Sequence, residues 1–108
     1  MKNKVIIRKI IKHAEKVTNY CEKITNPRDF MSNLLIVEAC VFNLSQMGEL
    51  ANKLDNSFTD THPDIPWSEL YGLRNRIVHD YEGVNFTLIW EIIEYDLPEL
   101  INKLRSIC

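Results

Sequence analysis

The sequence has little glycine, few cysteines and no long apolar run. Only three glycines occur in 108 residues, while 45% of the residues are hydrophobic. Scarce glycine together with abundant Leu, Ile, Glu and Lys favours helices over strands, and this hydrophobic content argues against disorder. No stretch reaches about 18 uninterrupted apolar residues, and Val5, Ile6 and Ile7 are followed at once by Arg8 and Lys9. We therefore expect a packed cytoplasmic protein with neither a membrane span nor a signal peptide.

The cysteines and histidines are too few and too scattered for a metal centre or a disulfide framework. The cysteines are Cys21, Cys40 and Cys108, and the histidines are His13, His62 and His79. The cysteine spacing fits no zinc pattern, and an odd number cannot all pair. No HExxH motif or acidic trio at ligand spacing occurs. We expect three reduced thiols, as is usual in the cytosol, and no metal site.

Charge of either sign is unevenly distributed. The net charge of −2 argues against a broad basic surface that would coat nucleic acid. Six basic residues crowd the first 16 positions: Lys2, Lys4, Arg8, Lys9, Lys12 and Lys16. No Lys or Arg occurs between Ile77 and Asn102, where Asp80, Glu82, Glu91, Glu94, Asp96 and Glu99 gather. The basic cluster is either a local phosphate-binding patch or a solvated helix face, and the acidic segment suits a basic partner.

Apolar spacing of three and four predicts two long helices in the first half of the chain. The first spans about residues 3–25 and should end at Asn26-Pro27. The second spans about residues 30–54, and its broad apolar surface places it at the centre of a bundle or at an interface. Gly48 inside this helix costs about 1 kcal/mol relative to alanine. A close approach by another helix would offset that cost.

The second half is predicted to contain a loop and two or three further helices. Residues 55–66 are polar, contain two prolines and should form the loop. Pro66 suits the first position of a third helix, which should span residues 67–81. A break at 82–84 and a cap at Asn85 should begin a fourth helix. Pro98 should kink or restart the last segment, which ends near residue 104. The chain is thus predicted to be all-α, a single domain over 1–108 built as an antiparallel bundle of four to five helices.

The stretch RNRIVHDY at 74–81 combines a cation, an imidazole and a phenol on one predicted helix. Asn75 and His79 are four residues apart and share a face, and Arg74 and Tyr81, seven apart, also align. Arg74 and His79 diverge by about 140° around the helix. One helix therefore positions this pair poorly. Two copies that meet across a two-fold axis would bring both pairs into a shared cleft, which favours a homodimer.

These residue types suit metal-independent cleavage of RNA. Near neutral pH the imidazole of His79 can take a proton from a ribose 2′-hydroxyl or give one to the leaving oxygen. The guanidinium of Arg74 can hold the phosphate, and Asn75 can orient the histidine or contact a phosphate oxygen.

Simpler interpretations exist for the same residues. Arg74 and His79 can be a surface cation and a satisfied histidine. Arg76 and Asp80, four apart, can form a surface ion pair of little energetic value. Tyr81 can be a half-buried anchor. Glu49, a polar residue on the apolar second helix, can line the cleft or form an ion pair.

The spacing R-x-x-x-x-H-x-Y, together with its flanks, resembles the HepT-like branch of the HEPN superfamily. The flanks are HPDIPW at 62–67, LRNRIVHDYEGV at 73–84 and WEIIEYDLPEL at 90–100, in that order, and the first half matches more loosely through its two long helices and QMGELANKL. The resemblance implies an all-helical, homodimeric, metal-independent ribonuclease that needs no cofactor and is the toxin of a toxin–antitoxin pair.

The resemblance also implies roles for individual residues. Arg74 and His79 would be the catalytic pair, and Asn75 would fill the polar position after the arginine. The usual partner is an MntA-like minimal nucleotidyltransferase. It silences the toxin by transferring AMP to the tyrosine, here Tyr81. The resemblance leaves open whether the homodimer joins this partner in a higher assembly. The alternative is a non-catalytic helical module that binds a nucleotidyltransferase partner or a nucleotide through its acidic C-terminal surface.

Overall fold

The computed structural model describes residues 2–108, and within that range the chain forms helices and no strand. The longer helices are α1 (Lys2–Tyr20), α3 (Leu34–Ala51), α6 (Leu73–Glu82) and α8 (Leu97–Ser106). The shorter ones are α2 (Pro27–Met31), α4 (Asn56–Thr59), α5 (Trp67–Tyr71), α7 (Phe86–Glu91) and the π-helix η1 (Ile92–Asp96). The all-α prediction is confirmed.

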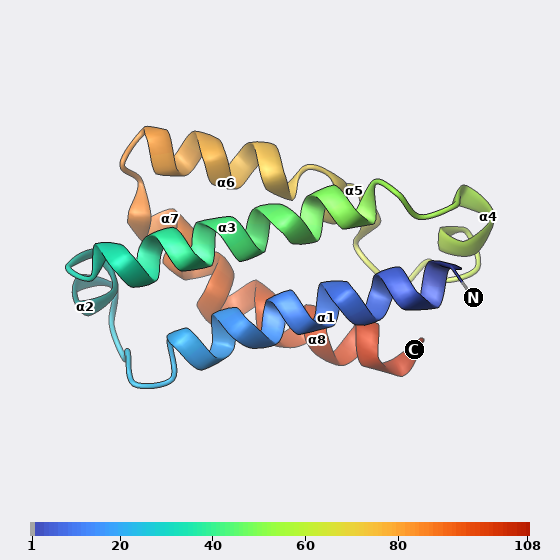
Figure 1. Cartoon of the computed structure of the whole chain (residues 1–108), viewed down its shortest axis with the longest axis horizontal. Coiled ribbons are helices and arrows are strands. Elements are labelled where there is room, and N and C mark those ends of the chain that lie inside the picture. The colour runs from blue at the N-terminus through green and yellow to red at the C-terminus, as the bar shows by residue number, and fades with distance from the viewer. Residues whose placement is uncertain (1) are drawn as a thin grey trace.

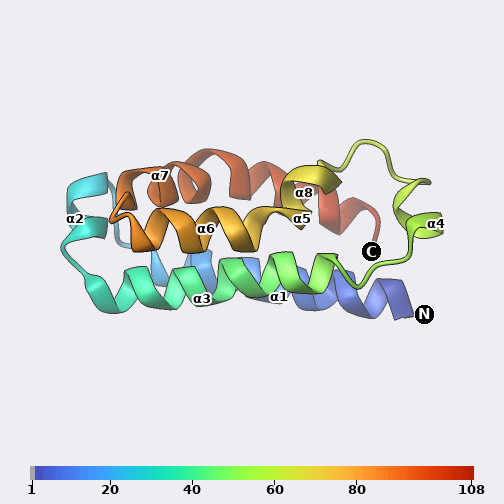
Figure 2. The same ribbon diagram turned by 90° about the horizontal axis from the view of Figure 1, so that it is seen from above.

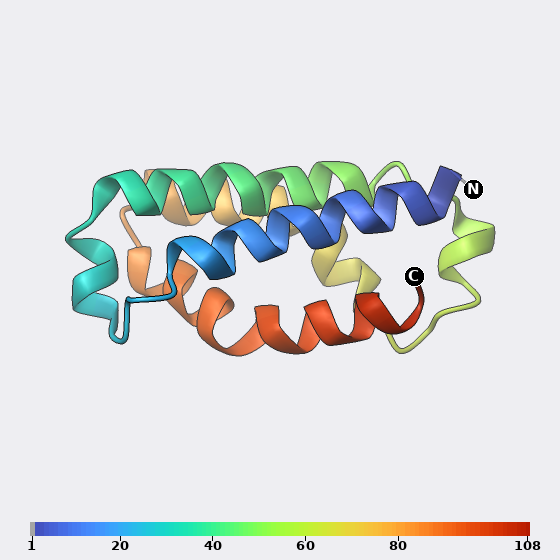
Figure 3. The ribbon, with the colours of Figure 1, turned by 60° about the horizontal axis from the view of Figure 1, so that its bottom comes forward.

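The helices form four columns that pack side by side, and consecutive columns run in opposite directions (Figure 1). The columns are α1, α3, the α5–α6 pair and the α7–η1–α8 segment. Figure 2 shows α6 alongside α3 on one side and α7 on the other, and Figure 3 shows α1 between α3 and α8. The bundle is elongated, with extents of 42 × 25 × 19 Å. This arrangement is the predicted antiparallel bundle, with α2 and α4 as single turns in the connections.

The apolar stripe predicted for the first helix forms the contact of α1 with the core. Ile6, Ile7, Ile10, Ile11, Ala14 and Val17 are all buried. The predicted end of this helix was wrong, because α1 stops at Tyr20 and Asn26-Pro27 begins a new helix. The Asn26 side chain accepts a hydrogen bond from the backbone N–H of Asp29, and Pro27 is the first residue of α2.

The second helix is shorter than predicted and lies at the centre of the fold. Asn33 caps the start of α3, since its side-chain oxygen accepts a 3.2 Å hydrogen bond from the backbone N–H of Ile36. The helix ends at Ala51. By length and composition alone α3 could cross a membrane, a test that core helices of globular bundles also pass. Here α3 packs against both α1 and α6.

The third predicted helix is divided in two by Gly72, which ends α5 and precedes α6. The predicted loop at 55–66 contains the short helix α4. The break after α6 is confirmed, and Val84 there adopts a φ of 58°. Asn85 does precede α7, but its side chain makes no capping hydrogen bond. It lies instead against Gly83.

The last segment restarts as predicted. Pro98 lies in the first turn of α8, directly after the π-helix η1, and α8 continues to Ser106, two residues beyond the predicted end.

At Gly48, α3 approaches the start of α6 closely. A Cβ atom on Gly48 would lie 2.7 Å from the backbone nitrogen of Arg74 and 3.3 Å from the carbonyl oxygen of Leu70. A side chain at that distance would force the backbone of one helix to shift. The expected reason for a glycine inside this helix is therefore confirmed, and the contact places Arg74 directly against α3.

Candidate functional site

Arg74 and Tyr81, at opposite ends of α6, both contact acidic residues of α3. The Nε atom of Arg74 is 3.5 Å from Oε1 of Glu49, and the Tyr81 hydroxyl donates a 2.5 Å hydrogen bond to Oε2 of Glu38. Because α3 and α6 are antiparallel, the end of α3 meets the start of α6 and the start of α3 meets its end. The predicted alignment of Arg74 and Tyr81 on one face is confirmed.

Glu49 pairs with a residue of the motif itself, so the ion-pair role is confirmed, and the cleft-lining role stays a prediction. It forms an ion pair, and that pair lies beside Arg74. Both side chains are about half exposed, at 50% for Arg74 and 56% for Glu49. An ion pair as exposed as this is worth only about 0–1 kcal/mol. The guanidinium is therefore available to another anion.

Asn75 and His79 differ in their contacts. The side-chain oxygen of Asn75 accepts a 3.2 Å hydrogen bond from Nη1 of Arg74. His79 is exposed, and its ring forms no hydrogen bond within residues 2–108. Within a single chain Arg74 therefore contacts Asn75 and Glu49, and His79 lies apart from Arg74, as the helical geometry predicted. The Asn75 side chain contacts Arg74 and not His79.

Glu38 is the residue at this site that sequence reasoning missed. The hydrogen bond between Tyr81 and Glu38 is the main reason why the pKa of Tyr81 is raised, and burial adds to the effect. The Tyr81 ring also stacks on Phe86 with centroids 5.8 Å apart, so the anchor interpretation of this tyrosine holds as well. One feature of the sequence could have indicated Glu38. Glu38 and Glu49 are eleven residues apart, which is about three helical turns, so the two acidic residues share one face of a largely apolar helix.

The predicted surface ion pair between Arg76 and Asp80 is absent from the described part of the chain. Asp80 is only 5% exposed, and its Oδ2 atom is buried without a hydrogen-bond partner. The reason is helical phase, since Asp80 follows Leu73 and Ile77 on the buried face of α6.

The motif lies on an open face beside exposed apolar side chains. Leu35 is 79% exposed and Phe42 is 60% exposed. Spacings of three, four and seven residues put Leu35, Glu38, Phe42 and Glu49 on one stripe of α3. Charged, polar and apolar groups of this stripe therefore share one surface with the motif of α6.

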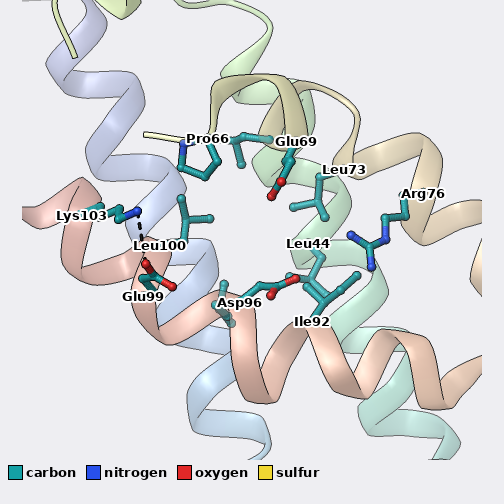
Figure 4. Close-up of a pocket in the computed structure, with 12 residues that line it drawn as sticks. Leu44, Pro66, Glu69, Leu73, Arg76, Ile92, Asp96, Glu99, Leu100 and Lys103 are labelled. Carbon is teal, nitrogen blue, oxygen red and sulfur yellow. Dashed lines mark ion pairs between the residues drawn. The ribbon is translucent and has the colours of Figure 1, made fainter. Parts of the chain in front are cut away.

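A cavity of about 220 Å³ lies elsewhere and contains none of the predicted site residues. It opens between the α5–α6 pair and the η1–α8 segment, with Leu44, Leu73 and Ile92 among its apolar lining, and Arg76 and Asp96 at its margin (Figure 4). Although large cavities are common ligand sites, the residues with matching chemistry lie outside this one. We therefore place the candidate site on the open face of α3 and α6.

No group of three or more His, Cys, Asp or Glu side chains among residues 2–108 is arranged to hold a metal ion. The cysteines are free thiols, but two of the three are not isolated, since the Sγ atoms of Cys21 and Cys40 are 3.6 Å apart.

Several known proteins and one family model resemble this chain in sequence. The family model "Ribonuclease HepT-like" matches residues 10–107. "Putative RNase MJ1380" of Methanocaldococcus jannaschii is 31% identical over 104 residues, which is 96% of this chain and 94% of the relative. A protein of Caldanaerobacter subterraneus, "Putative RNase TTE0752", is 35% identical over 73% of this chain and 70% of its own length. "Probable ribonuclease HepT" of Thermococcus cleftensis is 30% identical over 73% of this chain and 72% of its own. No solved structure matches the chain.

Proposed function

Since the chain belongs to the HepT-like ribonuclease family, we propose that it is a metal-independent endoribonuclease and the toxin of a cytoplasmic toxin–antitoxin pair. The observation that carries the proposal is the placement of the R-x-x-x-x-H-x-Y residues. Arg74, Asn75 and His79 are exposed on α6, and Tyr81 is held beside them against α3. An open cationic and imidazole-bearing face is what an extended RNA strand requires.

In the proposed reaction, His79 acts on the proton of the attacking ribose. Its imidazole takes the 2′-hydroxyl proton while the 2′-oxygen bonds to phosphorus, and the bond to the 5′-oxygen breaks. The products are a cyclic phosphate and a free 5′-hydroxyl, which receives a proton from a general acid. Arg74 holds the phosphate oxygens and stabilises the charge that builds on them. Its weak pairing with Glu49 is replaced by the phosphate.

We place the complete site between two copies of the chain. Arg74 and His79 diverge on one helix, so a second α6 across a two-fold axis supplies the complementary groups. The exposed Leu35 and Phe42 lie on the same surface, and their burial would favour such a dimer. RNA, as tRNA or mRNA, would then lie in the cleft between the copies.

Tyr81 is the proposed site of silencing by a cognate MntA-like nucleotidyltransferase. Its oxygen would attack the α-phosphorus of ATP and release pyrophosphate, leaving AMP on the ring. The added phosphate would lie beside the catalytic face and compete with RNA for Arg74. The hydroxyl proton already points to the Glu38 carboxylate, which can receive it.

The deciding experiment compares the wild-type protein with His79→Ala on total RNA and tRNA in the presence of EDTA. The wild type should produce fragments with cyclic-phosphate ends, and His79→Ala should produce none. Arg74→Ala should lose cleavage to a similar extent, on the order of 100-fold or more for a general acid–base or charge-stabilising group.

Matched controls are present in the same chain. His62→Ala removes a half-buried histidine whose ring packs on Phe58, and Arg76→Ala removes a neighbouring arginine from α6. Both should keep cleavage. Activity retained by folded His79→Ala, or no cleavage by a wild type whose intact mass shows no AMP, would refute the proposed function.

A further inference from the structure

Cys21 and Cys40 meet in the interior although 19 positions separate them in the sequence. Cys21 directly follows α1, Cys40 lies in α3, and their Sγ atoms are 3.6 Å apart. Cys21 is 8% exposed and Cys40 is fully buried, whereas Cys108 is exposed. A disulfide has an S–S bond of about 2.05 Å, so the sulfur atoms would need to approach by only about 1.5 Å to bond.

The two thiols differ in their surroundings. The hydrogen bond with Cys40 lowers the pKa of Cys21, and the same contact, together with burial, raises the pKa of Cys40 well above its ordinary range. The thiolate is the nucleophile in cysteine chemistry. Cys21 also keeps 8% of its surface exposed, whereas Cys40 keeps none. Both properties make Cys21 the first to react and Cys40 the second.

We propose that Cys21 and Cys40 form a modification site that hydroperoxides convert to an intramolecular disulfide. The Cys21 thiolate attacks hydrogen peroxide, an S–O bond forms as the O–O bond breaks, and the departing hydroxide takes up the thiol proton as water. The Cys40 sulfur then attacks the Cys21 sulfenic acid and releases a second water. Two thiols lose two hydrogen atoms and two electrons, and one peroxide becomes two waters. A small dithiol reverses the change.

The bond would link the end of α1 to the central helix α3. It would close the segment 22–39, which contains α2 and the first residues of α3. A cross-link over a loop of this length restricts the unfolded chain, so we expect the oxidised protein to melt about 10 °C higher than the reduced protein. This consequence is independent of ribonuclease activity.

The test uses full-length Cys108→Ser protein, treated with one equivalent of hydrogen peroxide. The product is alkylated in denaturant and digested with trypsin without reduction. Trypsin cuts after Lys16, Lys23, Arg28 and Lys53, which separates the peptides 17–23 and 29–53. We expect these two peptides to be joined, and to separate on reduction, in a protein whose intact mass is that of one chain. This readout is unaffected by oxidation of the exposed Met31.

Single-thiol variants test the order of reaction. In the Cys108→Ser background, Cys40→Ala should stop at a Cys21 sulfenic acid that dimedone captures, whereas Cys21→Ala should leave Cys40 unreactive. Two alkylated thiols after peroxide treatment of the Cys108→Ser protein would overturn the proposal, as would Cys21 oxidised to sulfinic acid without the linked peptides. If either variant fails to fold, the peptide map of the Cys108→Ser protein decides alone.

Discussion

Each of two acidic side chains on α3 holds one residue of the motif, and they do so with different strength. Glu38 accepts a 2.5 Å hydrogen bond from Tyr81, and Glu49 lies 3.5 Å from Arg74. The first contact fixes the orientation of the Tyr81 phenol. The second is a weak exposed pair that leaves the guanidinium able to exchange partners.

The Glu38 contact predicts how Tyr81 titrates. The neutral hydroxyl is favoured by the Glu38 carboxylate, so the pKa of Tyr81 is raised in the folded protein. The contribution of this bond to stability is complete below the ordinary tyrosine pKa and is lost as pH rises through the raised value. Glu38→Gln should lower the pKa of Tyr81, as followed by NMR of labelled tyrosine rings, with the signal assigned by Tyr81→Phe. Glu49→Gln is the control and should leave this titration unchanged. An unchanged titration in Glu38→Gln would show that Glu38 does not control Tyr81.

The proposed silencing predicts a separate effect of the hydroxyl. Tyr81→Phe should retain RNA cleavage, because the phenol takes no part in the cleavage step, but it should no longer be silenced by the nucleotidyltransferase and ATP. Cleavage after preincubation with that partner is the measurement, together with the intact mass for added AMP. Tyr95→Phe, at an exposed tyrosine of η1, should still be silenced. Silencing of the Tyr81→Phe protein would move the modification to another residue.

At the scale of elements, the contact between α3 and α6 depends on the absence of a side chain at Gly48. A Cβ there would approach the backbone of Arg74 to 2.7 Å, and backbone cannot yield as a flexible side chain can. The site residues on both helices are therefore positioned by this contact.

Gly48→Ala is predicted to destabilise the fold in spite of the higher helix propensity of alanine. Overpacking costs about 1–3 kcal/mol and the propensity gain offsets about 1 kcal/mol of it, so we expect a net loss of up to about 2 kcal/mol by urea unfolding. Cleavage should fall as well, because α6 is displaced. Gly72→Ala is the matched control, since its Cβ would meet nothing closer than 3.7 Å, and it should be neutral or stabilising. A Gly48→Ala protein as stable as the wild type would show that the helices separate at no cost.

At the scale of the whole molecule, the open face of α3 and α6 is the proposed dimer surface. Phe42→Glu would place a charge on an apolar contact between copies, so the protein should become monomeric and lose RNA cleavage together. Light scattering after gel filtration measures the first effect and the RNA assay the second. Tyr95→Glu, an equally exposed aromatic outside this face, should change neither. A Phe42→Glu protein that is still dimeric would place the interface elsewhere.

The sequence by itself determined the features that depend on local spacing. The apolar stripe of α1 and the shared face of Arg74 and Tyr81 follow from a period of about 3.6 residues. The helical class follows from composition as well, and the break after Glu82 follows from the glycine at 83 and the asparagine at 85. Helix ends were predicted less well. One boundary between two long helices was expected near residue 26, but Asn26 caps α2 and Asn33 caps α3, so the short helix α2 lies between the two long ones.

Only the tertiary structure decided which residues meet across helices. The contacts of Tyr81 with Glu38, of Arg74 with Glu49 and of Cys21 with Cys40 join residues 19 to 43 positions apart. Periodicity defines the face of each helix, but the rotation and register of one helix against another are set by packing of the whole core. The same packing covers the face of α6 that carries Leu73 and Ile77, and it therefore also buries Asp80, for which a surface ion pair had been predicted.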